Sequence, residues 1–199
     1  MSASIQIARS LRFRPATASR WKDIENLFGK NGACSGCWCM WWRQSAKEFR
    51  QNSGEKNKEL LRNRIDSGTI PGILVYDKNE PIGWCAVEPR ENYPRLEKSR
   101  SLKPIDDLRV WSIACFYIAK DHRRQRVSTR LVEAAVAFAK KKGAKLIEGY
   151  PTVYKNKGLP DSWVWTGLYS TFKRAGFKEV LRRSKSRPIM RYSLDKKHR

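Results

Sequence analysis

The fold of this protein is decided by residues 110–151, VWSIACFYIAKDHRRQRVSTRLVEAAVAFAKKKGAKLIEGYP. They begin with Val110 to Ile118, an apolar run of β-branched and aromatic residues that is long enough for a strand buried on both faces. The run ends in the polar residues Lys120 to Gln125. The carboxyl end of the predicted strand therefore meets a charged turn.

A helix is predicted after this turn, because apolar residues recur at offsets of three and four and so form one stripe against a sheet. They are Val127, Leu131, Ala134, Ala135 and Phe138. The lysines at 140–142 complement the negative end of the helix, and Gly143 can take the left-handed conformation that ends it. Leu146 to Tyr150 predicts a second strand. The unit is a β-α-β crossover with parallel neighbouring strands.

The turn between strand and helix is rich in cationic and hydroxyl side chains. His122 to Thr129, HRRQRVST, places arginines, a serine and a threonine at the predicted helix N-terminus. Unpaired backbone N–H groups and the positive end of the helix dipole favour an anion there, and arginine forks bind phosphate. The alternative is a solvated basic turn in which Ser128 or Thr129 caps the helix.

This order of strand, turn, long helix and strand resembles the acetyl-coenzyme A site of the GNAT N-acetyltransferase superfamily, with its R-x-x-G-x-G/A motif. Residues 123–128, RRQRVS, fall on that motif, and the sequence from Arg130 continues it in the style of the family. Arg126 and Ser128 stand where the family usually has glycine and glycine or alanine. Glycine permits close approach of the backbone to pyrophosphate. The Arg126 side chain must therefore point away or replace some of those contacts.

The resemblance implies acetyl-coenzyme A as the acyl-donor co-substrate, with pantetheine beside the first strand and pyrophosphate at the turn. The implied cofactor-binding residues are Cys115, Phe116, Tyr117, Ile118, Arg123, Arg124, Gln125, Arg126, Val127, Ser128 and Thr129. Cys115 is also a possible acyl carrier, but a thiol inside a buried strand is usually inert. Direct transfer to the acceptor is the expectation.

The composition predicts one folded domain with anionic partners. The chain has 199 residues, 40% of them hydrophobic, and 42 lysines and arginines against 19 acidic residues, which gives a formal charge of +23. A phosphorylated cofactor, an acidic substrate, nucleic acid or an anionic membrane surface would suit this charge. The charge is the sole indication of nucleic acid.

No apolar run approaches the ~20 residues of a membrane span, and the N-terminus has no apolar signal core. A cytoplasmic protein is expected, although the arginine and serine content of the first residues could also suggest an organelle transit peptide. The domain is predicted to cover residues 1–199, with 1–10 flexible and 195–199 a basic tail.

The cysteine–tryptophan segment, residues 29–43 (GKNGACSGCWCMWWR), has the most unusual composition in the chain. A structural zinc site has four protein ligands, whereas Cys34, Cys37 and Cys39 have no nearby histidine or fourth cysteine. Packing of sulfur side chains among aromatic rings is the stronger interpretation, and no metal site is predicted. Five cysteines, an odd count, argue against a complete disulfide framework. The resemblance implies that this segment walls the acceptor pocket.

Further elements follow from local patterns. Strands are expected at Leu11–Arg14, Gly72–Asp77, Ile82–Pro89, Glu179–Arg183 and Pro188–Leu194, and helices at 21–28, 59–67 and before Ala175. Thr17 or Ser19 is expected to cap the first helix, and Thr166 or Ser170 the last. A loop is expected over Thr152–Val164. The segment 90–109 carries apolar anchors and is expected to fold over the pocket mouth.

Candidate catalytic residues come from the chemistry that amine acetylation needs. A carboxylate can take the proton of the amine, and Glu88, near the end of a predicted strand, is the candidate. The alternative is a surface ion pair of Glu88 with Arg90 or Arg95. Asp106 and Asp107 are further candidate carboxylates.

The last helix, ending in Ala175-Gly176-Phe177, also resembles GNAT domains. In that family a tyrosine four residues before the glycine–phenylalanine pair often protonates the leaving thiolate, but here Phe172 occupies the position and cannot donate a proton. Tyr169 is the nearest phenol and is the candidate acid, with simple packing as the alternative. Ser170 could orient the thioester or a water.

The resemblance covers nearly the whole chain and predicts a single α/β (α+β) domain, with a mixed twisted central sheet, splayed at the cofactor strand, and helices on both faces. The implied function is acetyl-CoA-dependent N-acetyl transfer, directly to an amine of a small molecule or peptide. The alternative is a catalytically weak binding module of this fold that uses its positive charge on nucleic acid or an acidic partner. A metal or thiol-redox protein built on the cysteines is a third hypothesis.

Overall fold

A computed structural model describes residues 11–153 and 164–195. Its centre is one sheet of seven strands: β1 (Arg12–Pro15), β2 (Gly72–Asp77), β3 (Glu80–Pro89), β4 (Trp111–Ile118), β5 (Leu146–Gly149), β6 (Lys178–Leu181) and β7 (Ile189–Ser193). The strands lie in the order β1-β2-β3-β4-β5-β7-β6. Neighbours pair antiparallel except β4 and β5, which are parallel. The predicted mixed sheet is confirmed.

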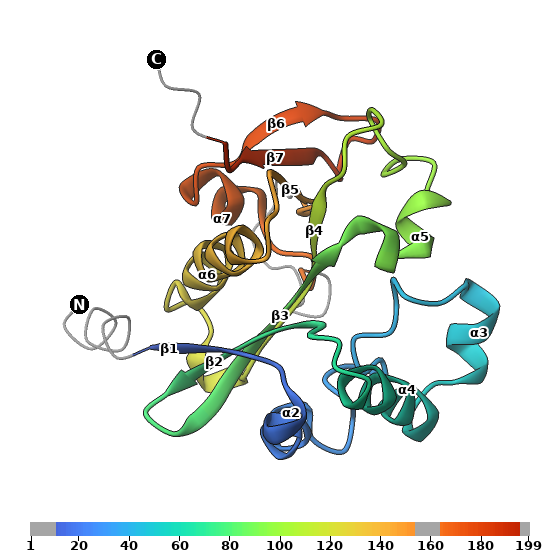
Figure 1. The fold of residues 1–199 in the computed structure, drawn as a ribbon, viewed down its shortest axis with the longest axis vertical. Helices are drawn as coiled ribbons and strands as arrows, with labels where there is room; N and C mark the ends of the chain where they lie inside the picture. Colours follow the sequence, from blue (N-terminus) through green and yellow to red (C-terminus); the bar gives the residue numbers. More distant parts are fainter. Residues whose placement is uncertain (1–10, 154–163, 196–199) are drawn as a thin grey trace.

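Helices cover both faces of this sheet (Figure 1). They are α2 (Trp21–Phe28), α3 (Ala46–Gln51), α4 (Glu55–Asp66), α5 (Pro94–Glu97), α6 (Val127–Lys141) and α7 (Tyr169–Arg174), with the 3₁₀ turns η1 (Ala18–Arg20), η2 (Arg90–Asn92) and η3 (Lys120–His122). The crossover from β4 through α6 to β5 is the unit predicted from residues 110–151, and Gly143 ends α6 with φ +85°. No helix in the described parts of the chain is long and apolar enough to cross a membrane.

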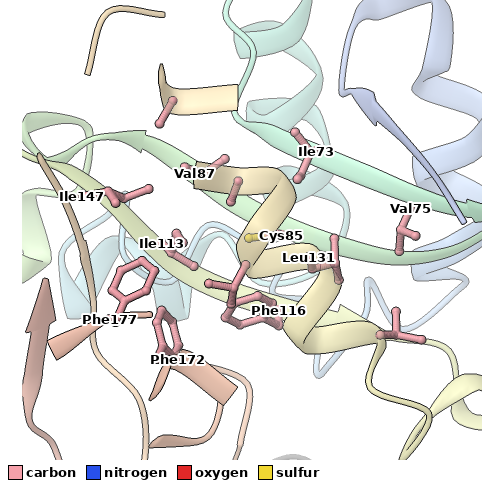
Figure 2. Packing of buried hydrophobic residues seen from close by; sticks show 14 of the residues in the cluster. Ile73, Val75, Cys85, Val87, Ile113, Phe116, Leu131, Ile147, Phe172 and Phe177 are labelled. Carbon is pink, nitrogen blue, oxygen red and sulfur yellow. The ribbon is translucent and has the colours of Figure 1, made fainter. Parts of the chain in front are cut away.

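One face of the sheet packs against α6 and α7 (Figure 2). Leu131 of α6 and the rings of Phe116, Phe172 and Phe177 meet there, with ring centroids 6.0 Å apart for Phe116–Phe172 and 5.0 Å for Phe172–Phe177. Gly149 on β5 permits this packing, because a Cβ at this position would lie 2.0 Å from Cε1 of Phe172.

The opposite face packs against α2 and α4 with an aromatic cluster that the cysteine–tryptophan segment completes. Trp38 of that segment lies with its ring centroid 5.6 Å from that of Phe28, which in turn lies 5.6 Å from the ring of Trp84 on β3. Cys39 is buried in this cluster, whereas Cys34 is exposed. The interpretation of sulfur packed among aromatic rings therefore holds for Cys39.

Strand β4 leaves its parallel partner early. It pairs with β5 only from Trp111 to Ile113, and the register with β3 then shifts so that Ala114 is an extra residue between Ile113 and Cys115. Beyond this bulge the N–H of Phe116 donates to the carbonyl of Trp165, at 2.6 Å, rather than to a strand. The sheet is thus splayed beside the second half of β4.

The predicted helix caps were wrong. Helix α2 follows η1 directly, with Arg20 at its N-cap; α6 has Arg126 and α7 has Leu168 at that position, and no cap side chain accepts a hydrogen bond at any of the three. Each start is instead set by the preceding backbone: a 3₁₀ turn, a left-handed residue or an extended one. Capping side chains are one of several ways to satisfy the first amides of a helix.

The prediction for residues 90–109 was also wrong, because they do not cover the cavity described below. They form η2 and α5, and Tyr93, Leu96 and Leu102 are buried in a cluster with Trp42, Tyr150 and Ile189. Arg90 ties the segment to the sheet by donating to Glu148 at 3.1 Å and to the hydroxyl of Tyr150 at 2.6 Å. The predictions for residues 1–10 and 196–199, and for most of the loop 152–164, lie outside the described residues.

Candidate active site

A cavity of about 940 Å³ lies beside the splayed half of β4. Most of its lining comes from the cysteine–tryptophan segment, the second half of β4, the start of α6 with its preceding turn, and the start of α7 with the residues before it. Phe28, Phe49 and Trp84 complete the described lining. Among the predicted cofactor residues, the lining contains Cys115, Phe116, Tyr117, Ile118, Arg123, Arg124, Arg126, Val127 and Ser128. Gln125 and Thr129 are not in the lining.

The turn before α6 has the backbone of a glycine-rich turn although it contains no glycine. Arg124 and Arg126 both take left-handed conformations, with φ +60° and +61°, on either side of Gln125. Such alternation points successive N–H groups into one concavity that binds anions. The amides of residues 124–128 donate to no acceptor among the described residues. The helix that follows has no acidic side chain in its first turn.

Buried polar atoms without partners gather at the same turn. His122 Nδ1, Gln125 Oε1 and Thr129 Oγ1 are buried and find no hydrogen-bond partner in the described parts of the chain. Arg126 is exposed, lines the cavity, and its side chain makes no hydrogen bond or ion pair to described residues. Gln125 and Thr129 do not line the cavity, so the fit to a phosphorylated group rests on the turn amides and on the Arg126 side chain, with the backbone offering the donors that the family obtains with glycine.

The other end of the cavity is aromatic and thiol-rich. Cys37, Cys39, Trp41, Trp42 and Phe49 line it, and no carboxylate is among the described lining residues. Trp165 closes this end, with its ring centroid 5.6 Å from that of Trp42 and 6.1 Å from that of Trp41. No group of three or more histidine, cysteine or acidic side chains in the described residues is arranged to hold a metal.

Three cysteines at this end of the cavity differ in the direction of their pKa shifts. Burial raises the pKa of Cys37 to about 11. Burial also opposes the charged form of Cys39, but hydrogen bonds from Cys115 and Trp84 and the charge of Arg43 outweigh it and lower the pKa of Cys39 to about 6. The same hydrogen bond, followed by burial, raises the pKa of Cys115. The surroundings therefore favour the charged form at Cys39 and the neutral form at Cys115.

Glu88 lies outside the cavity lining. Its side chain is 2% exposed, and it accepts from Arg43, from Arg64 Nη2 at 2.8 Å and from Asn92 Nδ2 at 3.3 Å. The alternative of a surface ion pair with Arg90 or Arg95 was wrong, because the partners of the buried Glu88 are the buried Arg43 and the partly exposed Arg64. Asp106 instead pairs with Arg191, and neither it nor Asp107 lines the cavity.

Of the three residues of α7 that the sequence analysis considered, one lines the cavity and two do not. Ser170 lines the cavity, as do its neighbour Thr171 and Arg174. Tyr169 is not in the lining; it packs against the core, with the Arg182 guanidinium 5.7 Å from its ring centroid. Phe172 is fully buried in the core. The structure thus brings Ser170 to the cavity but not Glu88 or Tyr169.

The cysteine–tryptophan segment was expected to wall the pocket and does line the cavity, but the sequence did not mark Cys39 within it, and it did not single out His122, Thr171 or Arg174 as site residues. The sequence motif covers only the β4-α6 unit, and His122 could have been predicted because it directly precedes that motif. The position of Cys39 depends on the path of an irregular segment, and no local sequence pattern predicts that path.

Comparison with known proteins agrees with this architecture. Residues 38–158 match the model of the acetyltransferase (GNAT) family. No curated protein matches the sequence. Among solved structures, the chain is similar to PaiA N-acetyltransferase from Thermoplasma acidophilum in complex with coenzyme A, at 16% identity over 92% of this chain and 99% of that one, with a TM-score of 0.52.

Two further solved structures share the fold. The acetyltransferase of the GNAT family from Listeria monocytogenes is 10% identical over 92% of this chain and 95% of that one, with a TM-score of 0.56. The ribosomal-protein-S5-alanine acetyltransferase from Vibrio fischeri is 12% identical over 94% of each chain, with a TM-score of 0.53. With the family model matching more than half of its length and the fold agreeing throughout, this chain belongs to the GNAT acetyltransferase family.

Proposed function

We propose that the protein transfers an acetyl group from acetyl-coenzyme A directly to the amine of a small molecule or peptide. The observation that carries this proposal is the turn before α6, where the amides of residues 124–128 have no acceptor among the described residues and border a cavity. Family membership supports acyl transfer, and the solved neighbour that contains coenzyme A supports the choice of donor.

The residues of the arginine turn, 122–129, would hold the phosphates through backbone amides, with the charges of Arg123, Arg124 and Arg126 beside them. When bound, acetyl-coenzyme A supplies an activated thioester. The pantetheine arm would follow β4 toward the cysteine end of the cavity. The N–H of Phe116 now donates to the carbonyl of Trp165. This hydrogen bond must break before the same N–H can donate to pantetheine.

The acceptor is expected to carry an apolar or aromatic group beside its amine. Trp41, Trp42 and Phe49 line the acceptor end, and the described lining contains no carboxylate to pair with further positive charges. The net charge of +23 also repels polycations. An arylalkylamine or the N-terminus of an apolar peptide therefore fits this end better than a polyamine does.

Calorimetry with acetyl-coenzyme A and with the non-acylated coenzyme tests the binding step. Saturable binding of both is expected. Thiol release is then followed with phenethylamine, spermidine and a peptide that begins with alanine, the last because one structural neighbour is named for an alanine of a ribosomal protein. Absence of saturable coenzyme binding would overturn the proposal. Binding without thiol release over the panel would favour the binding module instead.

A further inference from the structure

The sulfur of Cys39 is surrounded by donors. Trp84 Nε1 lies 3.2 Å from it and Arg43 Nη1 lies 3.6 Å from it. Neither an indole N–H nor a guanidinium can accept a hydrogen bond, so the sulfur is the acceptor in both contacts. A sulfur that only accepts is in the environment of a thiolate.

Arg43 is held rigidly beside this sulfur. Its side chain is 2% exposed, and it donates to the carbonyls of Cys39 at 2.7 Å and Pro71 at 3.0 Å and to the carboxylate of Glu88. These contacts come from the cysteine–tryptophan segment, from β3 and from the residue before β2. These contacts hold the guanidinium beside the sulfur.

The buried charge beside the sulfur shares its counter-ion. Glu88 accepts from the buried Arg43 and also from Arg64, whose side chain is 30% exposed. Burial keeps Tyr93, whose hydroxyl lies 3.3 Å from Arg43 Nη2, from ionising by raising its pKa. Buried charge is costly unless it is paired. An anionic Cys39 gives Arg43 a second counter-ion.

Cys39 also lies where a base is needed. It belongs to the cavity lining together with Cys115 on β4, whereas Glu88 and Tyr169 do not. Among the described lining residues near Cys39, the other ionisable side chains are thiols and the phenol of Tyr117, and His122 belongs to the turn where the phosphates would bind. A thiolate with a pKa near neutrality suits general base catalysis.

We propose that the sulfur of Cys39, held as a thiolate by Arg43 and Trp84, is the general base that accepts the proton of the acceptor amine. This inference rests on the proposed function. The amine nitrogen bonds to the thioester carbonyl carbon, the carbon–sulfur bond to the coenzyme breaks, and the proton lost by nitrogen moves to Cys39. Cys39 then gives this proton to the departing coenzyme thiolate, so that coenzyme thiol forms and the Cys39 thiolate is restored.

The lowered pKa of Cys39 agrees with this arrangement. The ionisable and donor groups that face the sulfur come from its own segment, from β3, from β4 and from the 90–109 segment. They are Cys37, Arg43, Trp84, Tyr93 and Cys115, with Glu88 behind Arg43, whereas Cys85 packs on the opposite face of the sheet.

Alkylation by iodoacetamide tests the thiolate without any coenzyme, because only the thiolate reacts. The rate at Cys39, followed by peptide mass spectrometry, should be half-maximal near pH 6 and level above pH 7. A rate that climbs through pH 8 to 9, as for an ordinary thiol, would overturn the proposal. So would complete protection of Cys39 at every pH, because a base must be reachable from the cavity.

Cys39→Ser tests the catalytic role, with Cys85→Ala as a matched control that removes a buried thiol outside the cavity. Cys39→Ser should bind acetyl-coenzyme A within about threefold of wild type, while kcat for the best amine of the panel falls roughly 10²-fold or more. The acidic limb of the kcat/KM profile near pH 6 should disappear in Cys39→Ser and persist in Cys85→Ala.

The outcomes separate the two proposals. Wild-type kcat in Cys39→Ser would overturn this inference and leave the proposed function standing. A wild-type protein that neither binds acetyl-coenzyme A nor releases thiol would overturn the proposed function, and the base role with it. An acetyl adduct on Cys39 that forms without amine and is discharged by amine would show a covalent carrier instead of a base, and so would also overturn the inference.

Discussion

The guanidinium of Arg43 donates to the carboxylate of Glu88, and each of the two side chains is only 2% exposed. This pair explains why the carboxylate expected to act as a base lies away from the cavity. The buried Arg43 needs a counter-ion, and Glu88 accepts from it and from the partly exposed Arg64. The role of the carboxylate is therefore to hold the cation that faces Cys39.

Removing the charge of Glu88 should destabilise the fold strongly. In Glu88→Gln the guanidinium of Arg43 stays buried without its counter-ion, which costs about 3 kcal/mol or more in the free energy of unfolding. Urea unfolding measures this. The control is Glu133→Gln, whose pair with Arg130 is exposed and should change stability by less than about 0.5 kcal/mol. A Glu88→Gln protein of wild-type stability with a large loss of kcat would instead support Glu88 as the base.

Arg126→Gly should stabilise the protein while coenzyme binding persists. Arg126 has φ +61°, where a side chain is strained, so glycine should add roughly 0.5 to 1 kcal/mol to the free energy of unfolding. Acetyl-coenzyme A affinity should fall by no more than about tenfold, because the turn amides remain and only one charge is lost. Urea unfolding and calorimetry measure the two effects.

The matched control for this substitution is Arg130→Gly, four residues further on inside α6. Glycine in the interior of a helix should destabilise by about 1 kcal/mol and leave binding unchanged. Loss of coenzyme binding in Arg126→Gly beyond a hundredfold would contradict the view that the backbone supplies the main phosphate contacts.

Gly149→Ala should disrupt the core at Phe172. The added Cβ would lie 2.0 Å from Cε1 of that ring, and relieving such overpacking costs about 2 to 3 kcal/mol. Gly143→Ala is the control, since no atom lies within 4 Å of its added Cβ and only the strain of its left-handed backbone remains, about 1 kcal/mol. In the Gly149→Ala background, Phe172→Leu should recover part of the loss. Additive effects in this double-mutant cycle would argue against direct contact.

Stability should rise with pH between about pH 6 and 8.5. The pKa of Cys39 is lowered to about 6 in the folded protein, so in this range the unfolded chain binds one more proton than the folded one. The stabilisation is fully present above the pKa that Cys39 has in the unfolded chain, and it is lost as the pH falls through the pKa that Cys39 has in the folded protein. The expected slope is up to about 1.4 kcal/mol per pH unit. Urea unfolding should show this slope in wild type and not in Cys39→Ser; equal slopes would contradict a thiolate.

Local pattern was sufficient for the regular elements. The apolar stripe from Val127 and the lysines before Gly143 predicted α6 with both of its ends, because helical periodicity and end signals act over a few residues. The strands of the hairpin β2-β3 followed for the same reason. The helix caps were predicted poorly. A serine or threonine near a helix start need not cap it when the backbone before the helix already sets where the helix begins, as the left-handed Arg126 does before α6.

The sequence by itself determined the order of elements, the family resemblance and the basic character of residues 122–129, because these depend on neighbours along the chain. Only the tertiary structure decided that Arg126 adopts the backbone of a glycine, that Glu88 is turned into the interior, and that Cys39 meets Trp84 and Cys115. Those contacts join residues tens of positions apart. Their energies come from desolvation and charge pairing inside a packed core, which no local pattern encodes.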